Sequence, residues 1–206
     1  QTDYIDPDVL DLIHDFRRET APAHDVKVSL LGFKDRYKLR DQIQYVDFST
    51  RELQENVTPD DVLNILRAGN ERFLRNETLH RDYNRQVDAT AEGQFPLAVV
   101  LSCIDSRTPA ELVFDLGLGD IFTVRIAGNV ARNKVLGSME YSCAVAGAKL
   151  LVVLGHTRCG AVTSSVDLLA AHQTAASATG CDNLDRLVIE IQKSIDESDP
   201  HLTSKL

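Results

Sequence analysis

The sequence predicts an α/β fold in which a parallel sheet is flanked by helices and preceded by an N-terminal helical arm. Two short, nearly continuous aliphatic runs carry this prediction, LAVVLS at 97–102 and LLVVLG at 150–155. Such runs are typical of strands that are buried on both faces of a parallel sheet. From residue 95 onward, strand and helix patterns alternate, which favours right-handed crossovers between parallel strands.

The N-terminal region predicts one helix and one strand, which are too few to bury their own apolar faces. Asp6 and Pro7 begin a helix over 6–19, as an N-cap residue followed by proline at the first helical position. Apolar residues follow at helical spacing, at Val9, Leu10, Ile13 and Phe16. The segment VKVSLLGF at 26–33 predicts a strand. Residues 34–56 are charged and weakly periodic, and they predict a linker or docking arm.

A second helix is predicted to begin at Thr58-Pro59, where acidic residues follow in the first turn. Its apolar face is expected at Val62, Leu66, Gly69 and Phe73. Residues 76–94 are polar and are expected to cross the surface before the first core strand. We therefore divide the chain into an arm at 1–48 and a main domain at 49–206.

The remaining elements follow in order along the chain. Strands are predicted at 97–102, 121–126 and 150–155, and helices at 109–114, 136–148, 160–172 and 184–195. No further strand follows the last helix, so we expect the sheet to have an open edge or the chain to be truncated.

Composition excludes several classes of protein. The net charge of -9 argues against a nucleic-acid partner, which would need a basic face. The longest apolar runs are about six residues, far from the roughly 20 that span a bilayer. The acidic N-terminus lacks an apolar segment, so we expect no signal peptide. Four cysteines are too few for a disulfide scaffold, which predicts a reducing, cytoplasmic compartment. We expect Cys143 to be a buried small hydrophobe, whereas Cys181 carries no signal.

Three side chains that bind metals follow the two aliphatic runs. Cys103 comes directly after the first run, and His156 and Cys159 follow the second. Ligands bind at the carboxyl ends of strands in open α/β sheets, so we expect these three residues to meet there. A Cys2His set is one of the ligand sets of catalytic zinc sites, which keep a fourth position open.

Asp105 and Arg107 lie immediately beyond the first of these ligands. The Asp105 carboxylate could coordinate zinc, or it could pair with the Arg107 guanidinium in a bidentate fork. A plain surface ion pair is the third possibility. If Arg107 holds Asp105 away from the metal, the fourth position stays open to water.

Four separated motifs resemble those of the β-class carbonic anhydrases and occur in the family's order. They are CIDSR at 103–107, RIAGN at 125–129, SMEY at 138–141 and GHTRCG at 155–160. The resemblance covers about residues 58–196 and implies zinc held by Cys103, His156 and Cys159. Asp105 and Arg107 would form the catalytic dyad, and Gly128, Asn129 and Gly160 would border the substrate pocket.

The resemblance also implies the reversible hydration of carbon dioxide to bicarbonate, in a homodimer or a multiple of it. A proton must leave the site, and His172 and His201 are candidate shuttles by residue type alone. The chain departs from the family's pattern in three ways. It has no glutamine near Leu116-Gly117 to contact the substrate, no tryptophan near Val100, and no C-terminal strand and helix after residue 206.

The N-terminal segments at 4–13 and 26–33 resemble the tail of a STAS domain, the cytoplasmic module of SulP-type anion transporters. This resemblance implies a fusion, with the enzyme tethered to the inner face of the membrane beside a bicarbonate or sulfate transporter. An N-terminal arm that packs across a dimer is the alternative. Two other functions remain open: a non-catalytic zinc or interaction module that regulates the transporter, and a hydrolase of carbon disulfide or carbonyl sulfide.

Overall fold

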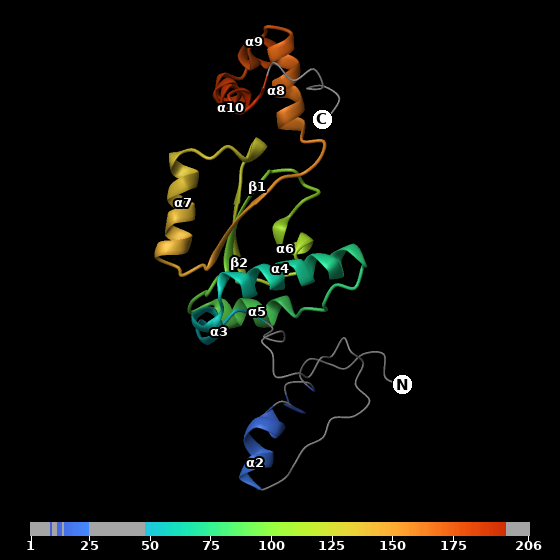
Figure 1. Ribbon diagram of the computed structural model, residues 1–206, viewed down its shortest axis with the longest axis vertical. Helices are drawn as coiled ribbons and strands as arrows, with labels where there is room; N and C mark the ends of the chain where they lie inside the picture. Colours follow the sequence, from blue (N-terminus) through green and yellow to red (C-terminus); the bar gives the residue numbers. More distant parts are fainter. Residues whose placement is uncertain (1–8, 10–11, 14, 25–47, 197–206) are drawn as a thin grey trace. The chain divides into compact units, whose positions relative to one another are not determined.

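The computed structural model describes residues 9, 12–13, 15–24 and 48–196 of the chain, which divides into two units, 1–42 and 43–206. In the first unit, a π-helical turn, η1 (Phe16–Thr20), continues into α2 (Ala21–Ala23) (Figure 1). The described part of the predicted helix over 6–19 is helical and runs on to Ala23. The predicted strand at 26–33 lies outside the described residues. The division of the chain into an arm at 1–48 and a second domain at 49–206 remains a prediction.

The second unit contains a parallel sheet of three strands in the order β2-β1-β3. The strands are β1 (Ala98–Ser102), β2 (Ile121–Arg125) and β3 (Leu150–Leu154), so all three predicted strands are confirmed. Ser102, the last residue of β1, stands opposite Arg125 and Leu154, the last residues of its neighbours. The three strands therefore end together, and the loops that follow them share one edge of the sheet.

Helices cover the two faces of β1. Helix α7 (Asn133–Ala144) packs on one face, and α4 (Pro59–Leu74) with α6 (Ala110–Val113) on the other. Successive side chains of a strand point to opposite faces, so Val99 and Leu101 join the α7 side while Ala98 and Val100 join the α4 side. All five residues of β1 are buried, as predicted.

Strand β3 corrects the prediction that both aliphatic runs are buried on both faces. Its burial alternates, with Leu151 43% and Val153 60% exposed. Leu150, Val152 and Leu154 pack toward the core on the α4 side. Because β3 lies at the edge of the described sheet, only one of its faces is well covered within this unit.

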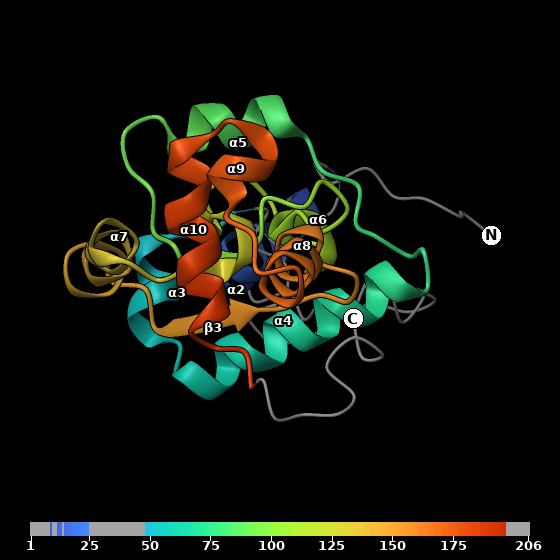
Figure 2. The same ribbon diagram turned by 90° about the horizontal axis from the view of Figure 1, so that it is seen from above.

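The helices after β3 gather at the carboxyl end of the sheet (Figure 1). Helix α10 (Asp182–Gln192) packs against both α8 (Gly160–Ala170) and α9 (Ala175–Thr179), as the view from above also shows (Figure 2). Helix α8 in turn contacts η3 (Ala127–Asn129), the short 3-10 turn after β2. The sequence predicted α8 and α10, but not the five-residue α9.

Two helices occupy segments for which we predicted none. Helix α3 (Arg51–Asn56) lies in the expected linker, and α5 (Tyr83–Thr90) lies in the expected surface crossing. Each buries a glutamine rather than an apolar residue. Gln54 donates to the carbonyls of Pro96 and Ala146, and the Gln86 amide oxygen accepts from Leu118 N–H. A buried polar side chain gives no apolar periodicity, which explains why both helices were missed.

The other helices agree with the sequence except at their edges. Thr58 caps α4 in a reciprocal bond with Asp61, and Val62, Leu66 and Gly69 are buried as expected. Phe73 is 40% exposed, so its predicted place in the apolar face is wrong. Helix α7 begins three residues before, and ends four residues before, the predicted 136–148. Among the described residues, no helix combines the length and apolar character needed to cross a membrane.

Candidate metal centre

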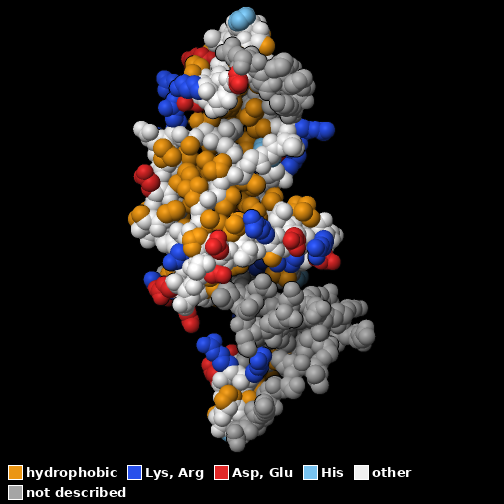
Figure 3. All heavy atoms as spheres, in the orientation of Figure 1, with side chains coloured by type: hydrophobic (Ala, Val, Ile, Leu, Met, Phe, Trp, Pro, Cys, Tyr) orange, Lys and Arg blue, Asp and Glu red, His pale blue; other side chains and the backbone are white. Residues whose placement is uncertain are grey.

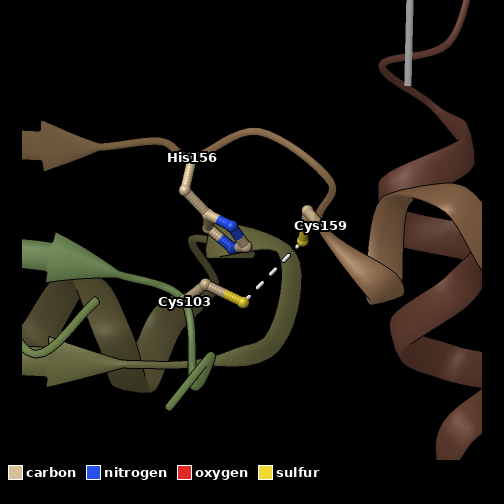
Figure 4. A group of neighbouring side chains, drawn as sticks. All are labelled: Cys103, His156 and Cys159. Carbon is tan, nitrogen blue, oxygen red and sulfur yellow. Dashed lines mark hydrogen bonds between the residues drawn. The ribbon is translucent and has the colours of Figure 1, made fainter. Parts of the chain in front are cut away.

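Cys103, His156 and Cys159 meet at the carboxyl edge of the sheet. Cys103 directly follows β1, His156 lies two residues beyond β3, and Cys159 is the N-cap of α8. Their candidate ligand atoms all lie within 4.8 Å of one another, and the two sulfur atoms are 3.8 Å apart. The His156 ring points between the two cysteine side chains (Figure 4). The structure therefore brings these three residues together, as expected from the sequence.

The histidine is oriented as a metal ligand requires. Its Nδ1 lies 3.0 Å from the carbonyl oxygen of Thr157, which fixes the proton on that nitrogen. Its Nε2 is buried and has no hydrogen-bond partner among the described residues. A buried polar atom without a partner is costly, and a metal ion between the ring and the sulfurs would satisfy it. Two thiols and one imidazole are a donor set suited to zinc.

The electrostatics of the cluster favour the thiolate form of Cys103. Burial by itself raises the pKa of this thiol. The His156 ring and the backbone N–H groups of Gly128 and Asp105 outweigh burial, and they bring the pKa down to about 7. The same thiolate raises the pKa of His156. Before any metal binds, the cluster thus already stabilises the charged sulfur that metal coordination needs.

Asp105 and Arg107 form the bidentate fork that their spacing permits. Arg107 Nε donates to Asp105 Oδ1 at 2.9 Å, and Nη2 donates to Oδ2 at 2.7 Å. Hydrogen bonds from the Arg107 side chain and backbone hold the pKa of the Asp105 carboxyl far below its usual range. The Asp105 carboxylate lies 3.9 Å from His156 Nδ1, at the margin of the cluster.

Arg107 also connects the two loops that carry the cluster. Its Nη2 donates to the carbonyl oxygen of Arg158 at 3.2 Å, and Arg158 lies directly before Cys159. One guanidinium therefore binds a carboxylate on the β1 loop and the main chain of the β3 loop. This second contact has no signature in the sequence, because any residue offers a backbone carbonyl.

The three residues expected to border the substrate do not share one cavity. Gly128 and Asn129 line a cavity of about 460 Å³ between η3 and α10, together with Val162, Glu190 and Ile191. Gly160 is the first residue of α8, directly after Cys159, and does not line this cavity. Their roles toward a substrate remain predictions.

The remaining candidates lie apart from the cluster or outside the described chain. His172 follows the end of α8 and has a positive φ of 48°, whereas His201 lies outside the described residues. Cys143 is exposed, so the prediction that it is buried is wrong. Its helix, α7, turns Val135, Met139 and Ser142 inward instead. Cys181 is exposed as well.

The fold and the cluster together define an α/β protein with a Cys2His centre suited to zinc. The family model described as carbonic anhydrase matches residues 98–205, just over half of the chain. The chain belongs to the carbonic anhydrase family.

Curated relatives agree with this assignment. The chain is 46% identical over 114 residues to carbonic anhydrase 2 of Mycobacterium tuberculosis H37Rv, covering 54% of each protein. It is also 46% identical over 116 residues to the carbonic anhydrase of Mycolicibacterium smegmatis, covering 55% of this chain and 56% of the relative. The chain thus spans about half the length of these relatives.

Among solved structures, part of the chain superposes on the β-carbonic anhydrase CafA of Aspergillus fumigatus. That overlap has 25% sequence identity and a TM-score of 0.39, and it covers 52% of this chain and 60% of the other.

Proposed function

We propose that the chain holds zinc through Cys103, His156 and Cys159 and catalyses the reversible hydration of carbon dioxide to bicarbonate. The observation that carries this proposal is the buried Cys2His cluster with an ionised carboxylate held at its margin. Membership of the carbonic anhydrase family supports it. Zinc, when bound, lowers the pKa of a coordinated water toward about 7 and so supplies a nucleophile at neutral pH.

The chain's own residues then orient the reactants. Both oxygens of Asp105 bind Arg107, yet each carboxylate oxygen can accept a further hydrogen bond. Asp105 accepts a hydrogen bond from the nucleophilic water and turns the lone pair of that water toward carbon dioxide. Arg107 keeps Asp105 ionised and holds it away from the metal. A freely moving carboxylate could instead take the fourth ligand position and exclude water.

The surroundings of the cluster would admit a small, uncharged substrate. Gly160 directly follows Cys159, and no atom lies within 4 Å of the place where its side chain would begin, whereas Gly128 packs closely against Ile191 of α10. Asn129 Nδ2 is bound to a backbone carbonyl, whereas its Oδ1 is buried without a hydrogen-bond partner in the described part of the chain. We propose that these three residues border the carbon dioxide site.

Stopped-flow hydration of carbon dioxide by the zinc-loaded chain tests the proposal. We expect turnover by the wild type and loss of most turnover in Asp105→Asn, with zinc content near one per chain in both. Asp88→Asn on the exposed face of α5 is the matched control and should retain full activity. Full activity of Asp105→Asn would contradict the role of Asp105. Hydrolysis of carbon disulfide or carbonyl sulfide without hydration of carbon dioxide would contradict the substrate.

We also propose that the chain works as a homodimer or a multiple of it. Exposed apolar side chains on neighbouring elements support this proposal, at Leu151 and Val153 of β3, at Tyr141 of α7 and at Val145, the residue that caps α7. Figure 3 shows hydrophobic side chains gathered over the region of β3 and α7. Sedimentation velocity should give at least twice the monomer mass, and a monomer at micromolar concentration would contradict the proposal.

Coupling to an anion transporter at the inner face of the membrane is a separate proposal, supported by the sequence resemblance at 4–13 and 26–33. The reading frame upstream of Gln1 tests it. A series of membrane-spanning segments there would support the fusion, and an unrelated or absent upstream domain would contradict it.

A further inference from the structure

Strand β2 supplies none of the three ligands, yet its end contacts the loop that carries Cys103. Arg125, the last residue of β2, donates from Nε to the carbonyl oxygen of Cys103 at 3.0 Å. Its Nη2 donates to the carbonyl oxygen of Asp105. One planar guanidinium thus binds the main chain on both sides of Ile104. A lysine would offer three donors from one rotatable ammonium group, without the planar fork of fixed geometry that spans these two carbonyls.

Four residues later, the same segment contacts the end of β3. Asn129 Nδ2 donates to the carbonyl oxygen of Leu154 at 2.9 Å, two residues before His156. Asn129 and the preceding Gly128 both have positive φ values, 55° and 62°. This left-handed pair turns the chain at the point where Asn129 meets the end of β3.

Helices α8 and α10 hold this segment in place. A Cβ atom at Gly128 would lie 2.5 Å from Ile191 Cδ1 of α10 and 3.7 Å from Ala161 Cβ of α8. The end of β2 and η3 therefore lie between the two ligand loops on one side and a packed pair of helices on the other. A segment confined in this way can fix the separation of two loops that are about fifty residues apart in the sequence.

We infer that Arg125 and Asn129 are positioning residues that set the distance between the Cys103 loop and the His156–Cys159 loop before metal binds. We call residues 125–129 the brace. This inference rests on the proposed function, because it concerns the same zinc site. Metal ligands must be held to within about 0.5 Å of their working geometry, and the groups that hold them contribute to metal affinity without touching the ion.

Two substitutions remove one half of the brace each. Arg125→Ala deletes both bonds to the β1 loop. Asn129→Asp keeps the size of the side chain but replaces the donor of the bond to Leu154 with an acceptor. Matched controls lie on the exposed face of α4, where Arg67→Ala and Asn64→Asp make the same chemical changes far from the strand ends. If Arg125→Ala fails to fold, Arg125→Lys retains the charge but loses the planar fork that spans the two carbonyls.

Zinc affinity is measured on the full chain by competition with a chromophoric chelator. We expect each brace variant to bind zinc about 10- to 100-fold more weakly than the wild type, the usual effect of losing a group that orients a ligand. The controls should stay within about twofold. Unchanged zinc affinity in both brace variants would overturn the inference, and so would an equal loss in the controls.

Cobalt(II) substitution separates positioning from general stability. The absorption of cobalt bound to two thiolates and an imidazole depends on the angles among them. The brace variants should therefore shift or weaken the cobalt bands even at saturating metal. A spectrum identical to that of the wild type, with only a lower melting temperature, would assign these residues a merely structural role and overturn the inference.

The outcome also distinguishes this inference from the proposed function. A wild type that binds zinc tightly but does not hydrate carbon dioxide would contradict the proposed function. Weaker zinc binding by the brace variants would still support the positioning role of Arg125 and Asn129. If the wild type hydrates carbon dioxide and the brace variants match its zinc affinity and cobalt spectrum, only the positioning role of Arg125 and Asn129 is contradicted. Failure of the wild type to bind zinc ends both.

Discussion

Strands β1 and β3 have similar sequences, and each is followed by candidate metal ligands, but their environments differ. Every residue of β1 is buried, whereas Leu151 and Val153 on one face of β3 are 43% and 60% exposed. The cause is position: β1 lies between two strands and under α7, while β3 lies at the edge of the described sheet. An aliphatic run therefore predicts a strand, but the topology decides its burial. To meet, the candidate ligands need only follow strands whose carboxyl ends lie at the same edge of the sheet.

Because both groups of candidate ligands lie at the same edge of the sheet, removing a ligand after either strand should destroy the site equally. We expect Cys103→Ser and His156→Ala both to lose stoichiometric zinc, because three protein ligands are the minimum of a catalytic zinc site. Metal analysis after gel filtration measures this. Cys143→Ser changes an exposed cysteine of α7 and should keep one zinc per chain. Stoichiometric zinc in either ligand variant would show that the site is held by other residues.

Substitutions in the two strands should also differ in their cost in unfolding free energy. Leu101 in β1 is 2% exposed, so Leu101→Ala should cost about 3 kcal/mol of unfolding free energy. Leu151 in β3 is 43% exposed, so the same substitution there should cost about 1 kcal/mol or less. Urea unfolding of the zinc-free proteins gives both values. Equal costs would mean that the open face of β3 is covered in solution, as it would be in a dimer.

The two sides of the cluster also differ in their titration. The pKa of Cys103 on the β1 side is lowered to about 7, whereas that of His156 on the β3 side is raised. Above pH 7 the Cys103 thiolate is ready to bind zinc. As the pH falls below 7, protons compete with zinc for Cys103, and this thiol alone should lower the apparent affinity about tenfold between pH 8 and pH 6. Chelator competition between pH 8 and pH 6 measures this, and a flat profile would contradict it.

The parts of the molecule that the sequence predicts are those with local signals. Continuous aliphatic runs predicted β1 and β3, and the segment IFTVRI at 121–126 predicted β2. Ligand-type residues shortly after β1 and β3 predicted the cluster. The fork of Asp105 and Arg107 could be anticipated because the two residues are neighbours in the chain.

The parts that were missed depend on contacts between distant segments. Helices α3 and α5 are each held by one buried glutamine, Gln54 or Gln86, and so lack an apolar period. The exposure of Cys143 follows from the way α7 is rotated on the sheet. Arg125 and Asn129 bind main-chain carbonyls, which every residue carries, so nothing in the spacing of side chains indicates their partners.

X-ray absorption of the zinc-loaded chain, compared with Asp105→Asn, tests the central claim most directly. The claim is that two cysteines and one histidine hold zinc while Arg107 keeps Asp105 off the metal. It predicts a shell of two sulfurs at about 2.3 Å with lighter atoms at about 2.0 Å, and superimposable spectra for the two proteins. A different number of sulfurs, or a light-atom shell that changes when Asp105 is replaced, would contradict it.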